Sequence, residues 1–196
     1  MPAIELLPSL KDDLALIKGA GAEAGRIAMR HFKRDPQVWT KENDSPVSEA
    51  DFAVDRFLRE TLLAERPGYG WLSEETEEDP DRFSRRRSFV VDPIDGTRAF
   101  LKGDTTWCVS IAIVEDGVSQ VGILDCPALE ELFEAVRGEG AQRNGVAISA
   151  KGQNEVPSIA GPANMLRELP EKLSIANRKS KHIPSLAYRI AMVADG

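Results

Sequence analysis

Asp92-Pro93-Ile94-Asp95-Gly96-Thr97 is the stretch that decides the interpretation of this chain of 196 residues. The apolar run Ser88–Val91 directly before it predicts a buried strand, and Pro93 is expected to end that strand because proline cannot donate to a sheet ladder. Gly96 and Thr97 are expected to open a short helix, whose free N–H groups suit an anion. The stretch therefore predicts two carboxylates brought together where a strand stops.

The chemistry of this stretch allows two interpretations. Hard divalent cations prefer carboxylate oxygens, and phosphate groups bind to such cations and to backbone donors. Asp-Pro and Asp-Gly pairs are also common in ordinary turns, which need no metal. The pattern by itself leaves a metal site and a structural turn both open.

Two further segments carry acids where a predicted element ends or begins. The run Trp71-Leu72-Ser73-Glu74-Glu75 is strand-like and ends in two carboxylates. The segment Lys41–Asp51 ends with an acid in the first turn of a predicted helix, where Asp51 can also serve as a cap. Three acid-bearing ends in one domain are hard to explain as surface decoration, so we expect them to form one site.

These motifs resemble those of the inositol monophosphatase superfamily, which comprises Mg²⁺-dependent, lithium-sensitive phosphatases and includes the 3'(2'),5'-bisphosphate nucleotidases. The matching motifs are K-x-x-D-S-P-V-S-x-A-D at Lys41–Asp51, W-L-S-E-E at Trp71–Glu75 and D-P-I-D-G-T at Asp92–Thr97. The resemblance implies a layered αβαβα sugar-phosphatase fold of the α+β or α/β class.

The resemblance also implies a role for each matching residue. Two or three Mg²⁺ ions would be held by Glu74, Asp92, Asp95 and the carbonyl oxygen of Ile94. Thr97, paired with Asp51, would form the catalytic pair that orients or deprotonates the attacking water. Contacts with the substrate would come from Glu74, Ile94, Asp95, Gly96 and Thr97. Glu75 would lie either behind the metal ligands or near a third, weaker ion, and Lys41 would reach phosphate through water.

Phosphate-monoester hydrolysis suits such a site on chemical grounds. The uncatalysed reaction is exceedingly slow, and its transition state spreads negative charge over the phosphoryl oxygens. Two cations about 4 Å apart stabilise both the attacking and the leaving oxygen. The only histidines are His31, predicted at a helix end, and His182, in a polar stretch. A phosphohistidine mechanism is therefore not expected.

Composition agrees with a soluble, cytoplasmic enzyme that acts on a small molecule. The chain is 42% hydrophobic, has no apolar stretch long enough to span a membrane and begins without a signal peptide. Its net charge of -7 opposes nucleic-acid binding, and Arg85–Arg87 is interpreted as a solvated loop. Cys108 and Cys126 are expected to be buried free thiols, although two cysteines allow one disulfide. A homodimer is a possible assembly.

Hydrophobic periodicity predicts helices first and strands afterwards. A helix over residues 9–32 would be capped by Ser9, and its Gly19, Gly21 and Gly25 suggest close packing against another element. A second helix would begin after Ser48 and stop before residue 67. Further strands are predicted over residues 106–114, 120–124, 132–136 and 146–149, and the first two of these are expected to form a hairpin.

We expect residues 1–150 to form a metal- and phosphate-binding α+β domain, and residues 151–196 to begin a smaller α/β domain on the substrate side. A helix predicted over residues 185–194 is similar to the family's G-[ST]-A segment, with Pro184 where the family usually has glycine. The family's W-D-x-A-A motif has no counterpart, because the sequence contains no Trp-Asp pair. The chain is therefore expected to be a truncated version of a longer protein.

The first expectation for the substrate is an inositol monophosphate. The alternative is 3'-phosphoadenosine 5'-phosphate, the substrate of a bisphosphate nucleotidase, and histidinol phosphate is hydrolysed by other relatives with the same metal site. The segment after residue 150 has few aromatic residues, which favours small polyol phosphates, and it carries four basic residues, Arg167, Arg178, Lys179 and Lys181. From another class, a catalytically weak relative that binds a phosphorylated ligand stays open.

Overall fold

The computed structural model of the chain describes residues 7–42, 44–77, 79–150, 159–160, 168, 178–179 and 183–196. Its elements are α1 Leu10–His31, β1 Val38–Thr40, β2 Pro46–Ser48, α2 Glu49–Glu65, β3 Gly70–Ser73, the 3₁₀ helix η1 Pro80–Ser84, β4 Arg87–Asp95, α3 Thr97–Leu101, β5 Cys108–Glu115, β6 Val118–Cys126, β7 Glu131–Val136, β8 Gly140–Arg143, β9 Val146–Ile148, β10 Ile159–Ala160, β11 Arg178–Lys179 and α5 Leu186–Asp195. Within these residues, seven strands form one sheet in the order β3-β4-β5-β6-β7-β8-β9.

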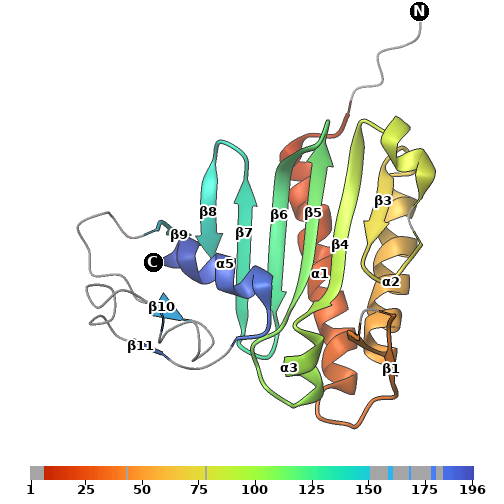
Figure 1. Ribbon diagram of the computed structural model, residues 1–196. Helices are drawn as coiled ribbons and strands as arrows, with labels where there is room; N and C mark the ends of the chain where they lie inside the picture. The colour runs from red at the N-terminus through yellow and green to blue at the C-terminus, as the bar shows by residue number, and fades with distance from the viewer. Residues whose placement is uncertain are drawn as a thin grey trace, which may run out of the picture.

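Helices α1 and α2 cover one face of this sheet, and α5 lies across the other (Figure 1). The β3–β4 pair is parallel and the remaining neighbours in the sheet are antiparallel. This arrangement confirms the predicted α+β class and supplies an α, a β and a second α layer of the predicted fold. The proposed division at residue 150 stays a proposal, although α5 packs on the sheet formed by earlier residues.

The main core lies between the sheet and the two long helices. Its largest fully buried side chains include Ile17, Leu58, Trp71, Phe89 and Ile111. Ser9 caps α1 by accepting a hydrogen bond from the Asp12 amide at 3.1 Å, and a Ser48–Asp51 capping box opens α2. The predicted starts of both helices are confirmed.

Two of the three glycines in α1 allow this helix to approach the sheet closely. A Cβ added at Gly21 would lie 2.5 Å from the Ile123 side chain, and one at Gly25 would collide with the Asp125 carboxylate. Nothing lies within 4 Å of a Cβ added at Gly19. The close packing predicted from these glycines is therefore correct for Gly21 and Gly25 and wrong for Gly19.

The prediction that Arg85–Arg87 is a solvated loop is wrong for Arg87, which begins β4 and is buried. Its guanidinium donates to Asp13 on α1 at 2.8 Å, and Arg66 Nε and the Tyr69 hydroxyl donate to the same carboxylate. A fully buried carboxylate needs such partners, since an unpaired charge is costly there. Because Asp13 is distant in sequence, the local pattern of three arginines gave no sign of it.

Pro93 does not end its strand, contrary to the prediction, because β4 continues to Asp95. Pairing with β3 stops at Val91. On that side, the ladder therefore needs no hydrogen bond from the backbone nitrogen of Pro93, which cannot donate one. On the other side, the register between β4 and β5 shifts between Asp92 and Asp95. A proline is tolerated at such an irregularity, and the strand thereby carries Asp95 to its end.

The predicted hairpin is confirmed with a tighter turn, formed by Asp116 and Gly117, both of which have positive φ. The strand predictions at 132–136 and 146–149 match β7 and β9. Strands β1, β2 and β8 were missed because each is only three or four residues long and shows no apolar alternation. None of the helices in the described ranges is long and apolar enough to cross a membrane.

Asp125 offers a test of packing between β6 and α1. Burial raises the pKa of Asp125 to about 6, and Arg26 offsets this only in part. A raised folded-state pKa means that stability is lost as the pH rises from 3.8 through about 6. We expect Asp125→Asn to raise the free energy of unfolding at about pH 8 by roughly 1 kcal/mol, with little effect at acid pH.

Denaturant unfolding at the two pH values measures this effect. Asp104→Asn is the matched control, because Asp104 is exposed. Equal effects of the two substitutions, or a stabilisation by Asp125→Asn that does not depend on pH, would contradict the account.

Candidate functional site

The parallel pairing of β3 and β4 brings two predicted metal ligands to one edge of the sheet. Ser73 pairs with Val91, so Glu74 and Asp92 are the next residues along the two strands, and the Glu74 amide donates to the Val91 carbonyl at 3.3 Å. Burial raises the pKa of Asp92 to about 8, together with the negative charges of Glu74 and Asp95 and a hydrogen bond with Glu74. These carboxylates therefore lie close enough to repel one another.

The predicted catalytic pair is formed across two elements. The Thr97 hydroxyl, at the start of α3, lies 3.3 Å from Asp51 Oδ1 and 3.0 Å from the carbonyl oxygen of Ile94. The other Asp51 oxygen accepts from the Ser48 amide at 2.8 Å and from the Ser48 hydroxyl at 2.6 Å. Capping and contact with Thr97 thus coexist at Asp51. Burial raises the pKa of Asp51 above its ordinary value, although these hydrogen bonds act to lower it.

Asp95 contacts α5, which the sequence did not indicate as a partner of this carboxylate. Asp95 Oδ2 accepts hydrogen bonds from the Ser185 hydroxyl at 2.5 Å and from the Ala187 amide at 2.7 Å, and Asp95 Oδ1 accepts from the Leu186 amide at 3.3 Å. The carboxylate therefore accepts hydrogen bonds from the otherwise unpaired N–H groups at the beginning of α5. Only the similarity of residues 185–194 to a pocket-lining segment could have suggested this contact.

Lys41 and Glu75 form a second charged layer beside Glu74. Lys41 Nζ lies 3.1 Å from Glu74 Oε1 and 2.8 Å from Glu75 Oε1. Burial acts to lower the pKa of Lys41, but the hydrogen bonds with Glu75 and Glu74 outweigh it and the pKa is raised. Burial also raises the pKa of Glu75, against the effect of Lys41. In this structure Lys41 is thus a counter-ion to two acids of the site.

Gly96 is required by the geometry between β4 and α3. Its φ of 95° is in the left-handed region that favours glycine, and an added Cβ would lie 3.1 Å from both the Ser185 side chain and the Thr106 carbonyl oxygen. A larger residue at this position would separate α3 from α5. The glycine of the D-P-I-D-G-T motif therefore has a structural reason of its own.

The donor chemistry of the site fits a hard cation such as Mg²⁺, although its side chains are engaged elsewhere. Among the described residues, no three acidic, histidine or cysteine side chains converge in a way that could hold a metal ion. Asp95 is bound by Ser185 and α5, and Glu74 is paired with Lys41. The remaining feature is Asp92, whose pKa is raised to about 8 by burial and by the crowding of the Glu74 and Asp95 charges. A cation would relieve that crowding, and carboxylate oxygens are the ligands that Mg²⁺ prefers.

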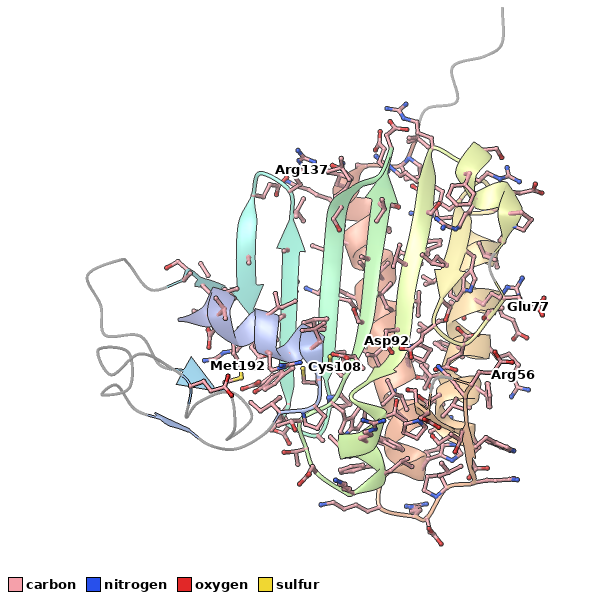
Figure 2. The ribbon with its side chains drawn as sticks, viewed as in Figure 1. Arg56, Glu77, Asp92, Cys108, Arg137 and Met192 are labelled. Atoms are coloured by element: carbon pink, nitrogen blue, oxygen red, sulfur yellow. The ribbon has the colours of Figure 1, made fainter. Side chains whose placement is uncertain are left out.

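Other predicted residues lie away from this cluster. His31 ends α1 and its Nδ1 lies 3.5 Å from Glu49 Oε1, which agrees with a surface role. Cys108 and Cys126 are buried free thiols, as predicted. Figure 2 labels Cys108 on β5 and Asp92 on the adjacent β4, and in this ladder Cys108 pairs with Asp95 whereas Asp92 pairs with Ser110. His182 and the basic residues Arg167 and Lys181 lie outside the described residues.

Comparison with known proteins identifies one family model and several relatives that match this chain. A family model described as the inositol monophosphatase family matches residues 10–196. The chain is 38% identical over 150 residues to a histidinol-phosphatase of Chlorobaculum parvum, covering 75% of this chain and 57% of the relative. It is 31% identical to inositol monophosphatase 1 of Solanum lycopersicum, covering 78% and 57%. The chain thus spans little more than half the length of these curated relatives.

Solved structures show the same fold. An inositol monophosphatase of Thermotoga maritima superposes with a TM-score of 0.82 at 26% identity, covering 94% of this chain and 73% of that one. The extragenic suppressor protein SuhB of Bartonella henselae superposes with a TM-score of 0.81 at 28% identity, covering 94% and 75%. The predicted family and fold are confirmed by these matches.

The substitution Asp92→Asn is expected to have opposite effects on the stability of the fold and on the binding of a cation. In the absence of a cation, stability is lost as the pH rises from 3.8 through about 8, because folding buries Asp92 and places it among other acids. At a pH above 8 and in the presence of a chelator, we expect the Asp92→Asn variant to have a higher melting temperature than the unmodified chain. The same change should weaken Mg²⁺ binding at least about tenfold, the loss typical of even an outer-shell partner.

Thermal melts with chelator and calorimetric titration with Mg²⁺ measure the two effects. Glu77→Gln is the control, since it removes a charge from an exposed residue near the site. A variant at Asp92 that binds Mg²⁺ as the unmodified chain does would refute the role of this carboxylate.

Proposed function

The chain belongs to the inositol monophosphatase family, and we propose that it hydrolyses phosphate monoesters with the help of Mg²⁺. The observation that carries this proposal is the contact of Thr97 with Asp51 beside the crowded carboxylate of Asp92. Here a hydroxyl and a proton acceptor lie next to a concentration of negative charge that a cation would neutralise. Relatives named as phosphatases support the same reaction class.

The cation would be held by oxygen atoms at the strand ends. These are the carboxylate oxygens of Glu74, Asp92 and Asp95 and the carbonyl oxygen of Ile94. When bound, Mg²⁺ supplies Lewis-acid stabilisation of the charge on the phosphoryl oxygens and lowers the pKa of water. Asp95 would have to share its oxygens between the cation and the amides of α5. Lys41 would release Glu74 and remain paired with Glu75. Inhibition by Li⁺ is part of this proposal, through replacement of one Mg²⁺.

Thr97 and Asp51 would move the proton of the attacking water. The water would donate to Thr97 Oγ1 while the threonine proton passes to Asp51 Oδ1, 3.3 Å away. Burial, which raises the pKa of Asp51, makes this carboxylate a better proton acceptor than an exposed aspartate. The hydrogen bonds from Ser48 hold the carboxylate in place during the transfer.

The phosphate group would lie against the beginning of α3. We assign the backbone N–H groups of Gly96 and Thr97 to its oxygens, because unpaired amides at a turn suit an anion. The left-handed conformation of Gly96 and its tight fit against Ser185 fix the direction of this turn. Substrate oxygens would thereby lie near the hydroxyl of Thr97.

Inositol monophosphate remains the first substrate candidate, in keeping with the family to which the chain belongs. Histidinol phosphate is the second, because two relatives named histidinol-phosphatase are 38% and 40% identical, whereas the tomato inositol monophosphatase is 31% identical. A bisphosphate nucleotidase named CysQ is 33% identical, which keeps 3'-phosphoadenosine 5'-phosphate as the third. All three are phosphate monoesters, so the reaction at phosphorus is the same.

Thr97→Ala tests the proposed proton transfer. We expect kcat to fall by about 10² to 10⁴, the usual contribution of a general base system, while Mg²⁺ affinity changes little. Thr97→Ser is the matched control, since it keeps the hydroxyl and should recover most of the rate. Steady-state kinetics on an aryl phosphate and calorimetry with Mg²⁺ give both quantities. If Thr97→Ala turns over at the unmodified rate, Thr97 has no part in proton transfer.

A panel of phosphate monoesters tests the substrate. We expect inositol monophosphate to give the highest kcat/KM, followed by histidinol phosphate, with 3'-phosphoadenosine 5'-phosphate lower by about tenfold, or roughly 1.4 kcal/mol of transition-state stabilisation. A preference for histidinol phosphate would make the second candidate the correct one. Absence of Mg²⁺-dependent turnover on every ester, in a chain that binds Mg²⁺, would instead favour a phospho-ligand-binding protein.

A further inference from the structure

Cys108 and Cys126 face each other across two neighbouring strands. Val109 pairs with Asp125 in the antiparallel β5–β6 ladder, so Cys108 at the start of β5 lies opposite Cys126 at the end of β6. Interaction with the neighbouring Cys126 side chain, together with burial, raises the pKa of the Cys108 thiol. Residues opposite each other in such a pair have Cα atoms about 4.5 to 5.5 Å apart, within the range of about 4.4 to 6.8 Å that a disulfide spans.

These thiols lie at the point where the sheet, Asp95 and α5 meet. Cys108 Sγ is 3.9 Å from Asp95 Oδ2 and 3.7 Å from Ser185 Oγ. Both cysteines are fully buried in a small cluster that includes Ala191 of α5, and Tyr188 packs against it. Helix α5 therefore covers the thiols, and one of them touches the same carboxylate that binds the first amides of this helix.

We propose that Cys108 and Cys126 form an oxidation-sensitive disulfide site that controls how α5 is held by Asp95. In the reduced chain Cys108 supports Asp95 and Ser185, and α5 closes over the pair. In the oxidised chain the sulfur of Cys108 is bonded to Cys126 and no longer donates to Asp95. Its consequence for phosphate hydrolysis rests on the proposed function, because Asp95 is a proposed cation ligand.

The oxidant in this proposal is a peroxide. One cysteine sulfur attacks a peroxide oxygen, the O–O bond breaks, and a sulfenic acid and one water are formed. The second sulfur attacks the first, the S–O bond breaks, and a second water leaves. Two thiols are oxidised and one hydrogen peroxide is reduced, and a dithiol reagent reverses the bond by thiol–disulfide exchange. Because α5 covers both thiols, the reaction requires α5 to move away transiently.

In the oxidised chain, we expect the first turn of α5 to lose its contact with Asp95. The amides of Leu186 and Ala187 donate to Asp95, so their exchange with solvent hydrogen reports on whether this contact holds. Formation of the disulfide moves Cys108 toward β6 and removes its support of Asp95 and Ser185. We therefore expect both amides to exchange several-fold faster in the oxidised chain.

The experiment treats the full chain with hydrogen peroxide, maps disulfides by peptide mass spectrometry and follows amide exchange by hydrogen–deuterium exchange. The expected result is a Cys108–Cys126 disulfide, faster exchange at Leu186 and Ala187, and recovery of the slow rate with dithiothreitol. Cys126→Ala is the matched control, since it keeps the contact of Cys108 with Asp95 but cannot form the bond. Peroxide should leave amide exchange in this variant unchanged.

Three results would overturn the proposal. These are oxidation without a bond between the two cysteines, a disulfide that leaves exchange at Leu186 and Ala187 unchanged, and equal acceleration in Cys126→Ala. Neither measurement requires a cation or turnover of a phosphate ester. A chain that forms the disulfide and releases α5 on oxidation but hydrolyses nothing in its reduced form would therefore refute the proposed function and leave this inference standing.

Discussion

The parallel pairing of β3 with β4 is the constraint on which the rest of the candidate site depends. Parallel neighbours finish at the same edge of a sheet, so Glu74 and Asp92 leave their strands side by side. The core packs against both strands through Trp71 and Phe89, so the carboxylates cannot separate unless buried apolar surface is exposed. The fold thus buries Asp92 beside other negative charges, and burial together with these charges raises the pKa of Asp92 to about 8.

Different partners neutralise this charge in the chain without a cation. A proton is favoured on Asp92, Lys41 pairs with Glu74, and Ser185 with the first amides of α5 binds Asp95. The acidic side chains are therefore engaged by separate partners. We expect a bound cation to replace these partners. On this view the site and α5 are linked through Asp95, and both depend on the end of β4.

Much of this arrangement was predictable from local sequence, because its elements are specified locally. The caps of α1 and α2, the hairpin after β5 and the Thr97–Asp51 contact follow from motifs within short stretches or from the resemblance to one family. The features that were missed depend on distant partners. Arg87 is buried because Asp13 on α1 receives it, and Asp95 meets α5 only after the chain has crossed the sheet. Pro93 was misjudged because its tolerance in β4 depends on where pairing with β3 stops.

Crystals grown with Mn²⁺ in place of Mg²⁺ test most directly whether the ends of β3 and β4 form a cation site. Anomalous diffraction locates Mn²⁺ independently of any assumption about the ligands. We expect anomalous peaks between the carboxylates of Glu74, Asp92 and Asp95, next to the carbonyl oxygen of Ile94, with Lys41 turned away from Glu74. Crystals that contain Mn²⁺ elsewhere but none between these carboxylates, with Lys41 still paired to Glu74, would contradict it.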